Sequence, residues 1–197
     1  MANETEKYKR RSIRLRDYDY SQAGAYFVTI CTQNHKCLFG EIVDGEMLLN
    51  NVGQVVQSIW LTLPERYAGV ELDQYMIMPN HLHGIVVLAG KQPKDSYTSK
   101  VPDRFEQYMY PKGPIYSTHQ QELGLPAPAL GEIIRTFKSL TTRFIRAAGA
   151  SDFAWQGNYY DHIIRNDDDL DRIRQYMIDN PTRWIERSFL DIEDAPL

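Results

Sequence analysis

The chain has 197 residues, a mass of 22.9 kDa, a formal net charge of −4 and a pI of about 5.7. With 43% hydrophobic and 24% charged residues, it has the composition of a soluble globular protein, and its length suits a single domain with its own hydrophobic core. Cys31 and Cys37 are the only cysteines, which excludes a disulfide framework and a four-cysteine zinc site, and no apolar run approaches the about 20 residues of a membrane helix.

The first half of the chain predicts a strand, a hairpin and a helix. Residues 25–31 are rich in β-branched and aromatic side chains, which favours a strand. Asp44-Gly45 divides the apolar stretch 38–49 into two short runs, and this dipeptide between apolar runs indicates a hairpin. Apolar residues then recur at helical spacing over 52–63, so a helix with one apolar face follows.

Two further strands and a long irregular segment occupy the middle of the chain. The strands are predicted over 70–78 and 82–89, joined by a tight turn at Pro79-Asn80. Residues 91–128 contain six of the ten prolines and no sustained apolar period. We interpret this stretch as a loop or lid inserted in the domain.

Two helices and a short strand are predicted near the C-terminus. The helix over 130–148 has an apolar stripe and, on another face, a basic stripe. A strand over 159–165 precedes a helix that begins near Asn166 with three aspartates in its first turn, where carboxylates suit the positive end of the helix dipole. We expect this helix to end by Asn180, because Pro181 disfavours helical geometry in the residue before it.

The order of these elements defines the expected fold class. Strands outnumber the crossover helices and two connections are hairpins, which excludes a doubly wound parallel sheet. We expect an α+β protein with a ferredoxin-like (RRM-like) antiparallel sheet and helices packed mainly on one face.

Charge is distributed unevenly along the chain. Six basic residues and no acidic ones lie between Lys7 and Arg16, whereas nine acidic residues and four arginines lie from Asp167 to the end. The net acidity counts against a nucleic-acid-binding protein, yet a basic segment can bind a phosphate backbone locally. The expected segments are a basic arm (1–22), a domain (23–185) and an acidic tail (186–197).

His81 and His83 are the first candidates for chemistry. Because side chains alternate along a strand, both imidazoles face the same way, about 6–7 Å apart along the strand, and Leu82 faces the core. Two such imidazoles can bind one divalent metal. The alternative is a pair of solvated or hydrogen-bonded histidines at a turn.

Tyr176 and Asn180 are the second pair. Four residues apart on a helix, they are neighbours at the edge of its buried stripe. Asparagine offers a hard oxygen ligand, and tyrosine offers a phenol that becomes a nucleophile when deprotonated with the help of a nearby metal. The alternative is an amphipathic tyrosine and an asparagine at the end of a helix.

Four segments of the sequence resemble motifs of one protein family, and they occur in the same order as in that family. The run Met78–Ile85 resembles the His-hydrophobic-His motif of single-tyrosine HUH transposases. With three further segments, the chain is similar to the REP-associated tyrosine transposases over about residues 10–183, apart from the 91–128 stretch. The further segments are Ile134–Ser139, Trp155–Asp161 and Tyr176–Pro181.

The resemblance implies a mechanism and a set of roles. His81, His83 and Asn180 would hold Mg²⁺ or Mn²⁺, and Tyr176 would attack a phosphate of single-stranded DNA, forming a 5′-phosphotyrosine link and freeing a 3′-hydroxyl. The family acts on DNA with imperfect hairpins beside the cleavage site, and its members occur as monomers and as homodimers. Phosphoryl transfer of this kind needs charge neutralised on the phosphate oxygens and an in-line nucleophile.

Basic residues outside these motifs are candidates for DNA contact. A charged helix face can equally be merely solvated, and a basic terminus can be disordered. Two other function classes stay open: a non-catalytic module that binds single-stranded nucleic acid, and a metal-dependent phosphodiesterase that uses water. In the absence of a secretory signal we expect a cytoplasmic protein with no membrane partner. The candidate DNA contacts are Arg10, Arg11, Arg14, Arg135, Lys138, Arg143 and Arg146.

Overall fold

The computed structural model describes residues 18–89 and 128–193, with side chains as far as residue 185. Most of the expected arm, including Arg10, Arg11 and Arg14, and nearly all of the expected 91–128 insertion lie outside the described residues. In chain order the elements are β1 (Gly24–Cys31), the short 3-10 helix η1 (Gln33–His35), β2 (Gly40–Val43), β3 (Glu46–Leu49), α1 (Asn51–Leu61), α2 (Leu63–Arg66), β4 (Val70–Met78), β5 (His81–Leu88), α4 (Leu130–Ala147), β6 (Tyr160–Ile164) and α5 (Asp167–Glu193).

A four-stranded antiparallel sheet forms the centre of the molecule. Its strand order is β4-β5-β1-β6, and each neighbouring pair is antiparallel. With α1 and α4 as the crossovers, this is the β-α-β-β-α-β order of a ferredoxin-like fold, to which β2 and β3 add a separate hairpin. The α+β ferredoxin-like prediction is therefore confirmed.

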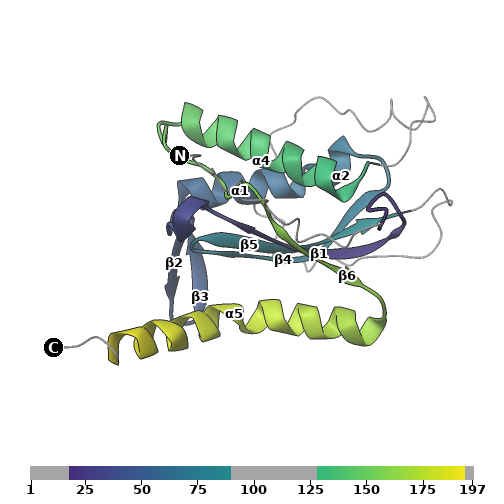
Figure 1. Cartoon of the computed structure of the whole chain (residues 1–197). Helices are drawn as coiled ribbons and strands as arrows, with labels where there is room; N and C mark the ends of the chain where they lie inside the picture. Colours follow the sequence, from purple (N-terminus) through teal and green to yellow (C-terminus); the bar gives the residue numbers. More distant parts are fainter. Residues whose placement is uncertain (1–17, 90–127, 194–197) are drawn as a thin grey trace, which may run out of the picture.

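One face of the sheet carries the main hydrophobic core. Helices α1 and α4 cover this face (Figure 1) and bury the alternate side chains Tyr26, Val28 and Ile30 of β1. The Trp60 and Phe137 rings of the two helices meet edge to face, with centroids 5.3 Å apart. Gly84 makes this packing possible, because a Cβ there would lie 2.3 Å from the Trp60 ring.

The first helix begins at a side-chain cap. Asn50 precedes α1, and its side-chain oxygen accepts hydrogen bonds from the backbone N–H groups of Val52 and Gly53 at 2.9 and 3.0 Å. Such a cap satisfies two of the four N–H groups that a helix start leaves without partners. The helix predicted from the apolar periodicity over 52–63 is present as α1, which begins at Asn51.

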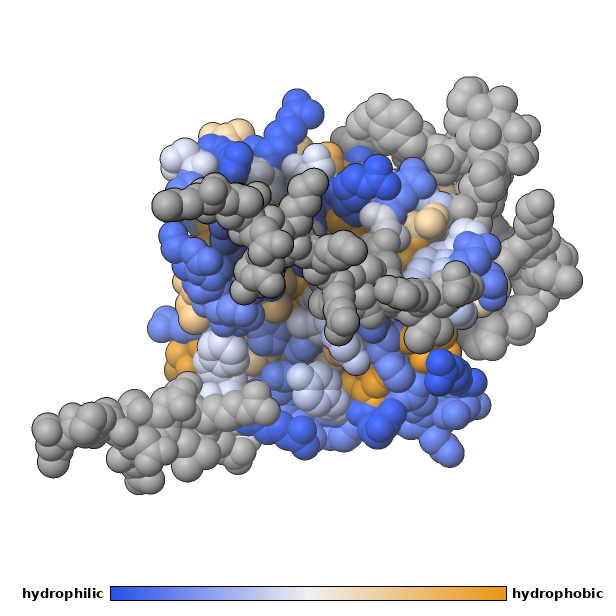
Figure 2. All heavy atoms as spheres, viewed as in Figure 1, coloured by the Kyte–Doolittle hydropathy of each residue, from blue (hydrophilic) through white to orange (hydrophobic). Residues whose placement is uncertain are grey.

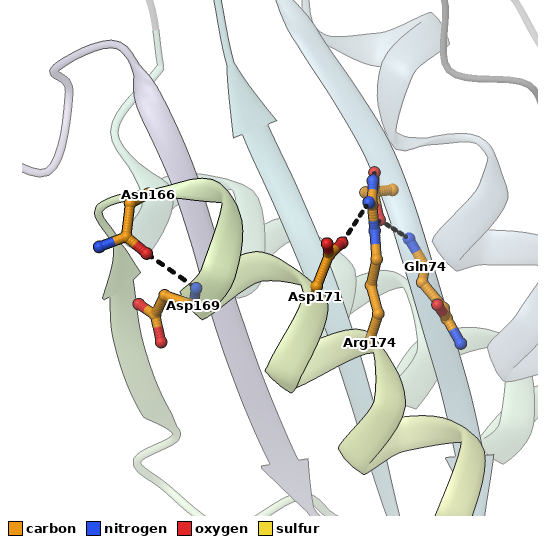
Figure 3. A network of polar contacts seen from close by, with 6 residues as sticks. Gln74, Asn166, Asp169, Asp171 and Arg174 are labelled. Atoms are coloured by element: carbon orange, nitrogen blue, oxygen red, sulfur yellow. Dashed lines mark hydrogen bonds and ion pairs between the residues drawn. The ribbon is translucent and has the colours of Figure 1, made fainter.

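Helix α5 covers the opposite face of the sheet (Figure 1) and packs there over a small apolar cluster. Arg174 fixes it to the strand beneath. Its Nε and Nη2 donate to the two carboxylate oxygens of Asp73 on β4 at 2.9 and 2.6 Å. Its Nη1 donates to Asp171 at 3.2 Å (Figure 3). A bidentate contact of this kind fixes orientation as well as distance. The residues of the cluster are Phe27, Ile85, Ile173 and Met177.

The last helix does not end where the sequence predicted. Helix α5 continues through Pro181 to Glu193, so the expected end at Asn180 is wrong. Proline removes one hydrogen bond from a helix interior, but packing beyond it holds the helix together. Pro181 is buried, Thr182 lies against the β2–β3 hairpin at Gly45, and the Trp184 ring lies 6.0 Å from that of His81.

In the view of Figure 2 the coloured surface is mainly hydrophilic, and its hydrophobic areas are small and separate. None of the helices in the described part of the chain combines the length and the apolar character needed to span a membrane.

Candidate functional site

A pocket of about 290 Å³ opens between β5 and α5, on the face of the sheet that α5 covers. All four residues that the sequence singled out for metal binding and nucleophilic attack line it, although almost a hundred residues separate the two pairs in the chain. The other lining residues come mainly from the ends of strands and from the last part of α5. The complete lining is Thr29, Cys31, His35, Asn80, His81, His83, Tyr176, Asn180, Arg183 and Trp184.

Strand alternation places the two histidines. Leu82 is fully buried in the core under α1 and α4, whereas His81 and His83 point toward α5. Their Nε2 atoms lie 2.9 Å apart. The two rings therefore converge on one point, as two ligands of a single centre must.

Hydrogen bonds fix the orientation of the first imidazole. Asn80 donates from Nδ2 to the His35 carbonyl at 3.2 Å, which turns its Oδ1 toward His81. His81 Nδ1 donates to that oxygen at 2.6 Å, so its Nε2 carries a lone pair that faces the pocket. A ligand histidine ordinarily makes such a hydrogen bond through its other ring nitrogen.

The second imidazole is held in a similar way. His83 Nδ1 shares a hydrogen bond of 2.8 Å with Thr29 Oγ1, and the Phe27 ring stacks on the imidazole at 5.3 Å. Burial, together with a smaller effect of a neighbouring histidine, lowers the pKa of His81 to about 4 and that of His83 to about 3; the neighbour is His35 for His81 and His81 for His83. Both rings are therefore neutral at pH 7, the state in which imidazole binds metals.

The donor set suits a small divalent cation with mixed nitrogen and oxygen ligands. Two ligands that bind an octahedral ion at about 2.1 Å and a right angle lie about 3 Å apart, close to the separation of the two Nε2 atoms. Asn180 is only 9% exposed, and its Nδ2 has no hydrogen-bond partner among the described residues. No group of three or more His, Cys, Asp or Glu side chains suited to a metal occurs in 18–89 or 128–185, so an amide oxygen would have to complete the set.

Helix α5 brings the phenol to this pocket. Tyr176 is 39% exposed, and its ring lies 5.4 Å from that of His83 and 6.2 Å from that of Phe27. The next residue, Met177, is fully buried beneath the helix, which fixes the rotation of α5 about its axis. An accessible hydroxyl beside two neutral imidazoles can act as a nucleophile if a bound cation and substrate place it in line.

Several residues of the pocket were missed by sequence reasoning. Asn80 carries the signal of a turn residue, and its side chain proves to orient His81. Thr29 lies beside His83 in the antiparallel register, which only the pairing of β1 with β5 reveals. Arg183 and Trp184 lie beyond the expected end of the last helix, so no contact with the pocket was predicted for them.

The basic residues of α4 lie elsewhere, because α4 covers the other face of the sheet (Figure 1). Arg135 and Lys138 line a second pocket of about 490 Å³ with Tyr20 and Tyr159. Lys138 Nζ donates to two backbone carbonyls of the 156–158 segment at 2.8 and 2.9 Å, so its ammonium group holds that segment in place.

The two remaining basic residues of α4 differ in their contacts. Arg146 donates from Nε to the Phe153 carbonyl at 2.9 Å, whereas Arg143 is exposed. The structure thus does not bring the four basic residues of α4 to the histidine pocket.

The 154–158 segment connects the two sides of the molecule. Trp155 donates from Nε1 to Thr141 of α4 at 2.8 Å. Gln156 Nε2 lies 2.8 Å from Nε2 of His35, which lines the histidine pocket. The segment thus contacts both α4 and a residue that lines the histidine pocket.

Comparison with known proteins finds a relative in sequence and neighbours in fold. No protein-family model matches it. An uncharacterized protein of Haemophilus influenzae is 37% identical over 177 residues, covering 90% of this chain and 91% of that protein. The structure of a REP-associated tyrosine transposase bound to a REP hairpin aligns with a TM-score of 0.51 and 18% identity, covering 86% of this chain and 73% of that one. A putative transposase from Deinococcus radiodurans aligns with a TM-score of 0.40 and 14% identity, over 85% of this chain and 96% of that one.

Proposed function

This chain belongs to the same family as the Haemophilus influenzae protein and has the fold of a REP-associated tyrosine transposase; from this premise we propose that it is a transposase-like enzyme that cuts and rejoins single-stranded DNA. The observation that carries the proposal is the meeting of Tyr176 with the converging imidazoles of His81 and His83 in one pocket. A hydrolase that activates water needs no tyrosine at this position.

Tyr176 is the proposed nucleophile. Its hydroxyl oxygen attacks the scissile phosphorus, the bond from phosphorus to the 3′ oxygen breaks, and the phenolic proton leaves to solvent while the freed 3′ oxygen takes one up. The product is a 5′-phosphotyrosine link and a 3′-hydroxyl. Because the energy of the phosphodiester is kept in the new bond, attack by a 3′-hydroxyl rejoins DNA without ATP.

His81, His83 and Asn180 would hold a Mg²⁺ or Mn²⁺ ion. Such an ion supplies neutralisation of the charge on the phosphate oxygens. The residues themselves supply a fixed position, since Asn80 and Thr29 orient the two imidazoles. With pKa values of about 4 and 3, neither imidazole is protonated to imidazolium at neutral pH, so we assign them a ligand role rather than general acid catalysis.

Single-stranded DNA that contains a hairpin is the proposed partner. A hairpin with an unpaired flank could lie with its backbone on the basic side of α4 and pass the 154–158 segment to the pocket. The protein would act as a monomer or a homodimer. The proposed backbone contacts are Arg135, Lys138, Arg143 and Arg146 of α4, with Arg10, Arg11 and Arg14 of the N-terminal arm.

The test is a search for the covalent intermediate. The full chain is incubated with Mg²⁺ or Mn²⁺ and single-stranded oligonucleotides that carry imperfect hairpins, and adducts are detected on a denaturing gel. We expect an adduct that Tyr176→Phe abolishes and that a chelator prevents. Tyr160→Phe is the matched control, because Tyr160 is also exposed, at 49%, but does not line the pocket.

Two other results would replace the proposal with a different function. Cleavage that continues in Tyr176→Phe without any adduct would indicate a phosphodiesterase that uses water. Salt-sensitive DNA binding without cleavage, unchanged in His81→Ala and in Tyr176→Phe, would indicate a binding module.

A further inference from the structure

The continuation of α5 past Pro181 brings an arginine to the pocket. Arg183 lies seven residues after Tyr176 and three after Asn180, so the three side chains follow one side of the helix. All three line the pocket, and the Arg183 side chain is 53% exposed. A helix that ended at Asn180 would not place a guanidinium group there.

The pocket contains few charges that could meet an anion. Of its described lining, Arg183 is the side chain that is always charged. A phosphodiester that enters the pocket brings a full negative charge. The proposed ion would neutralise part of this charge, and Arg183 is the cationic side chain of the pocket that can meet the rest.

Arg183 forms a weak ion pair with Asp179. Its Nη2 lies 3.4 Å from a carboxylate oxygen of Asp179, in an exposed pair at the i,i+4 spacing. Exposed pairs of this type contribute little free energy. Asp179 has a shorter hydrogen bond, from Gln175 Nε2 at 2.7 Å, so the guanidinium can exchange its carboxylate for a phosphate while Asp179 keeps a partner.

We propose that Arg183 is a further catalytic residue, which contacts the scissile phosphate and stabilises the negative charge on its non-bridging oxygens while Tyr176 attacks. The inference rests on the proposed function. Arg183 keeps all its protons through the step: the bond from the tyrosine oxygen to phosphorus forms, and the bond from phosphorus to the 3′ oxygen breaks. Its planar fork can donate two parallel hydrogen bonds to two phosphate oxygens, which a lysine cannot do.

The test measures the single-turnover rate of adduct formation and its dependence on DNA concentration. At saturating DNA we expect Arg183→Gln to lower the rate about 100-fold or more, as for the loss of a transition-state donor. Arg183→Lys keeps the positive charge but cannot donate two parallel hydrogen bonds, so we expect the rate of adduct formation to fall about 10-fold. A merely structural role would weaken folding in both variants, which circular dichroism and thermal melting would detect.

A matched control lies on the same helix. Arg172 is 75% exposed, does not line the pocket, and lies three helical turns before Arg183. Because Arg172→Gln makes the same chemical change and the same change of net charge, its rate should stay within about twofold of the wild type. A wild-type rate for Arg183→Gln at saturating DNA would overturn the inference and leave the proposed function intact.

Failure of the proposed function would be recognised separately. If the wild-type protein forms no adduct, the binding of a short oligothymidylate is measured over a range of salt concentrations. At least about 10-fold weaker binding by Arg183→Gln, with a smaller salt slope, would still support a phosphate contact by Arg183. Unchanged binding and slope would overturn it.

Discussion

The two faces of the sheet differ in what they contact. On the face under α1 and α4, large apolar side chains such as Trp60 and Phe137 fill the interior. On the face under α5, the apolar cluster contains four buried residues, and a polar pocket opens beside it. The comparison indicates that the face under α1 and α4 supplies most of the stability. Because folding depends less on the face under α5, that face can keep polar groups and an accessible tyrosine.

Strand β5 contributes side chains to both faces of the sheet. In β5, Leu82 is buried in the main core, and its neighbours His81 and His83 point into the pocket. Gly84 lets Trp60 pack directly against this strand. The position of the histidines is therefore determined by packing on the opposite face.

Removal of a large side chain from the main core should have the largest effect on stability. Trp60 is fully buried, and Trp60→Ala leaves a cavity against Phe137 and β5. We expect the free energy of unfolding to fall by about 3–5 kcal/mol. Urea denaturation measures it, and a loss below about 1 kcal/mol would contradict the assignment of the core to this face.

The equivalent change under α5 should lower the free energy of unfolding by a smaller amount. Met177 is fully buried between α5 and the sheet, and we expect Met177→Ala to lower the free energy of unfolding by about 2–3 kcal/mol. The same denaturation experiment gives the value. If the loss equalled or exceeded that of Trp60→Ala, the two faces would not differ as proposed.

The ion pair that attaches α5 to β4 should have a smaller and pH-dependent effect. Burial raises the pKa of Asp73, but hydrogen bonds from Arg174 and from the Gln74 N–H outweigh it, so the pKa lies below the ordinary 3.8. The ion pair therefore stabilises the fold at pH values above 3.8, and this stabilisation is lost as the pH falls through the lowered pKa of Asp73. We expect Asp73→Asn to lower the free energy of unfolding by about 1 kcal/mol at neutral pH.

This pH dependence is the check on the ion pair. Unfolding of the wild type and of Asp73→Asn is compared at neutral pH and at the lowest pH at which both remain folded. The difference between them should shrink as the pH falls. A difference that stayed constant or grew would show that the Arg174 contact does not act through the charge of Asp73.

The smallest effect on stability is expected at the pocket itself. Tyr176 is 39% exposed and touches Phe27 and His83 by its ring, which Tyr176→Phe retains. We expect the free energy of unfolding to change by less than about 0.5 kcal/mol. Thermal melting of this variant is also the control that any loss of adduct formation reflects chemistry rather than unfolding.

The sequence predicted those parts of the structure that follow from local periodicity. Alternation along a strand placed His81 and His83 on one side, and helical spacing placed Tyr176 next to Asn180. The same periodicity fails at Phe144, an apolar residue at the helical spacing of the stripe predicted over 130–148, which is 53% exposed. The adjacent Ile145 is only 1% exposed, so the buried face of α4 passes through Ile145 and leaves Phe144 outside it.

Features that depend on long-range contacts could not be predicted. The rule that proline ends a helix failed at Pro181, because Trp184 and Thr182 pack beyond it. The hydrogen bonds of Lys138 to two backbone carbonyls of the 156–158 segment likewise follow only from the fold. The orienting role of Asn80 depends on the position of His35 and cannot be recognised in a turn motif.

The central claim is that the tyrosine beside the two histidines forms the bond to DNA. The most direct measurement is proteolysis of the wild-type protein after incubation with Mg²⁺ or Mn²⁺ and hairpin-containing single-stranded DNA, followed by mass spectrometry of its tyrosine-containing peptides. The account predicts a 5′-linked nucleotide on Tyr176 and on no other tyrosine. A nucleotide on a different residue such as Tyr160, or cleavage of the DNA with every tyrosine unmodified, would contradict it.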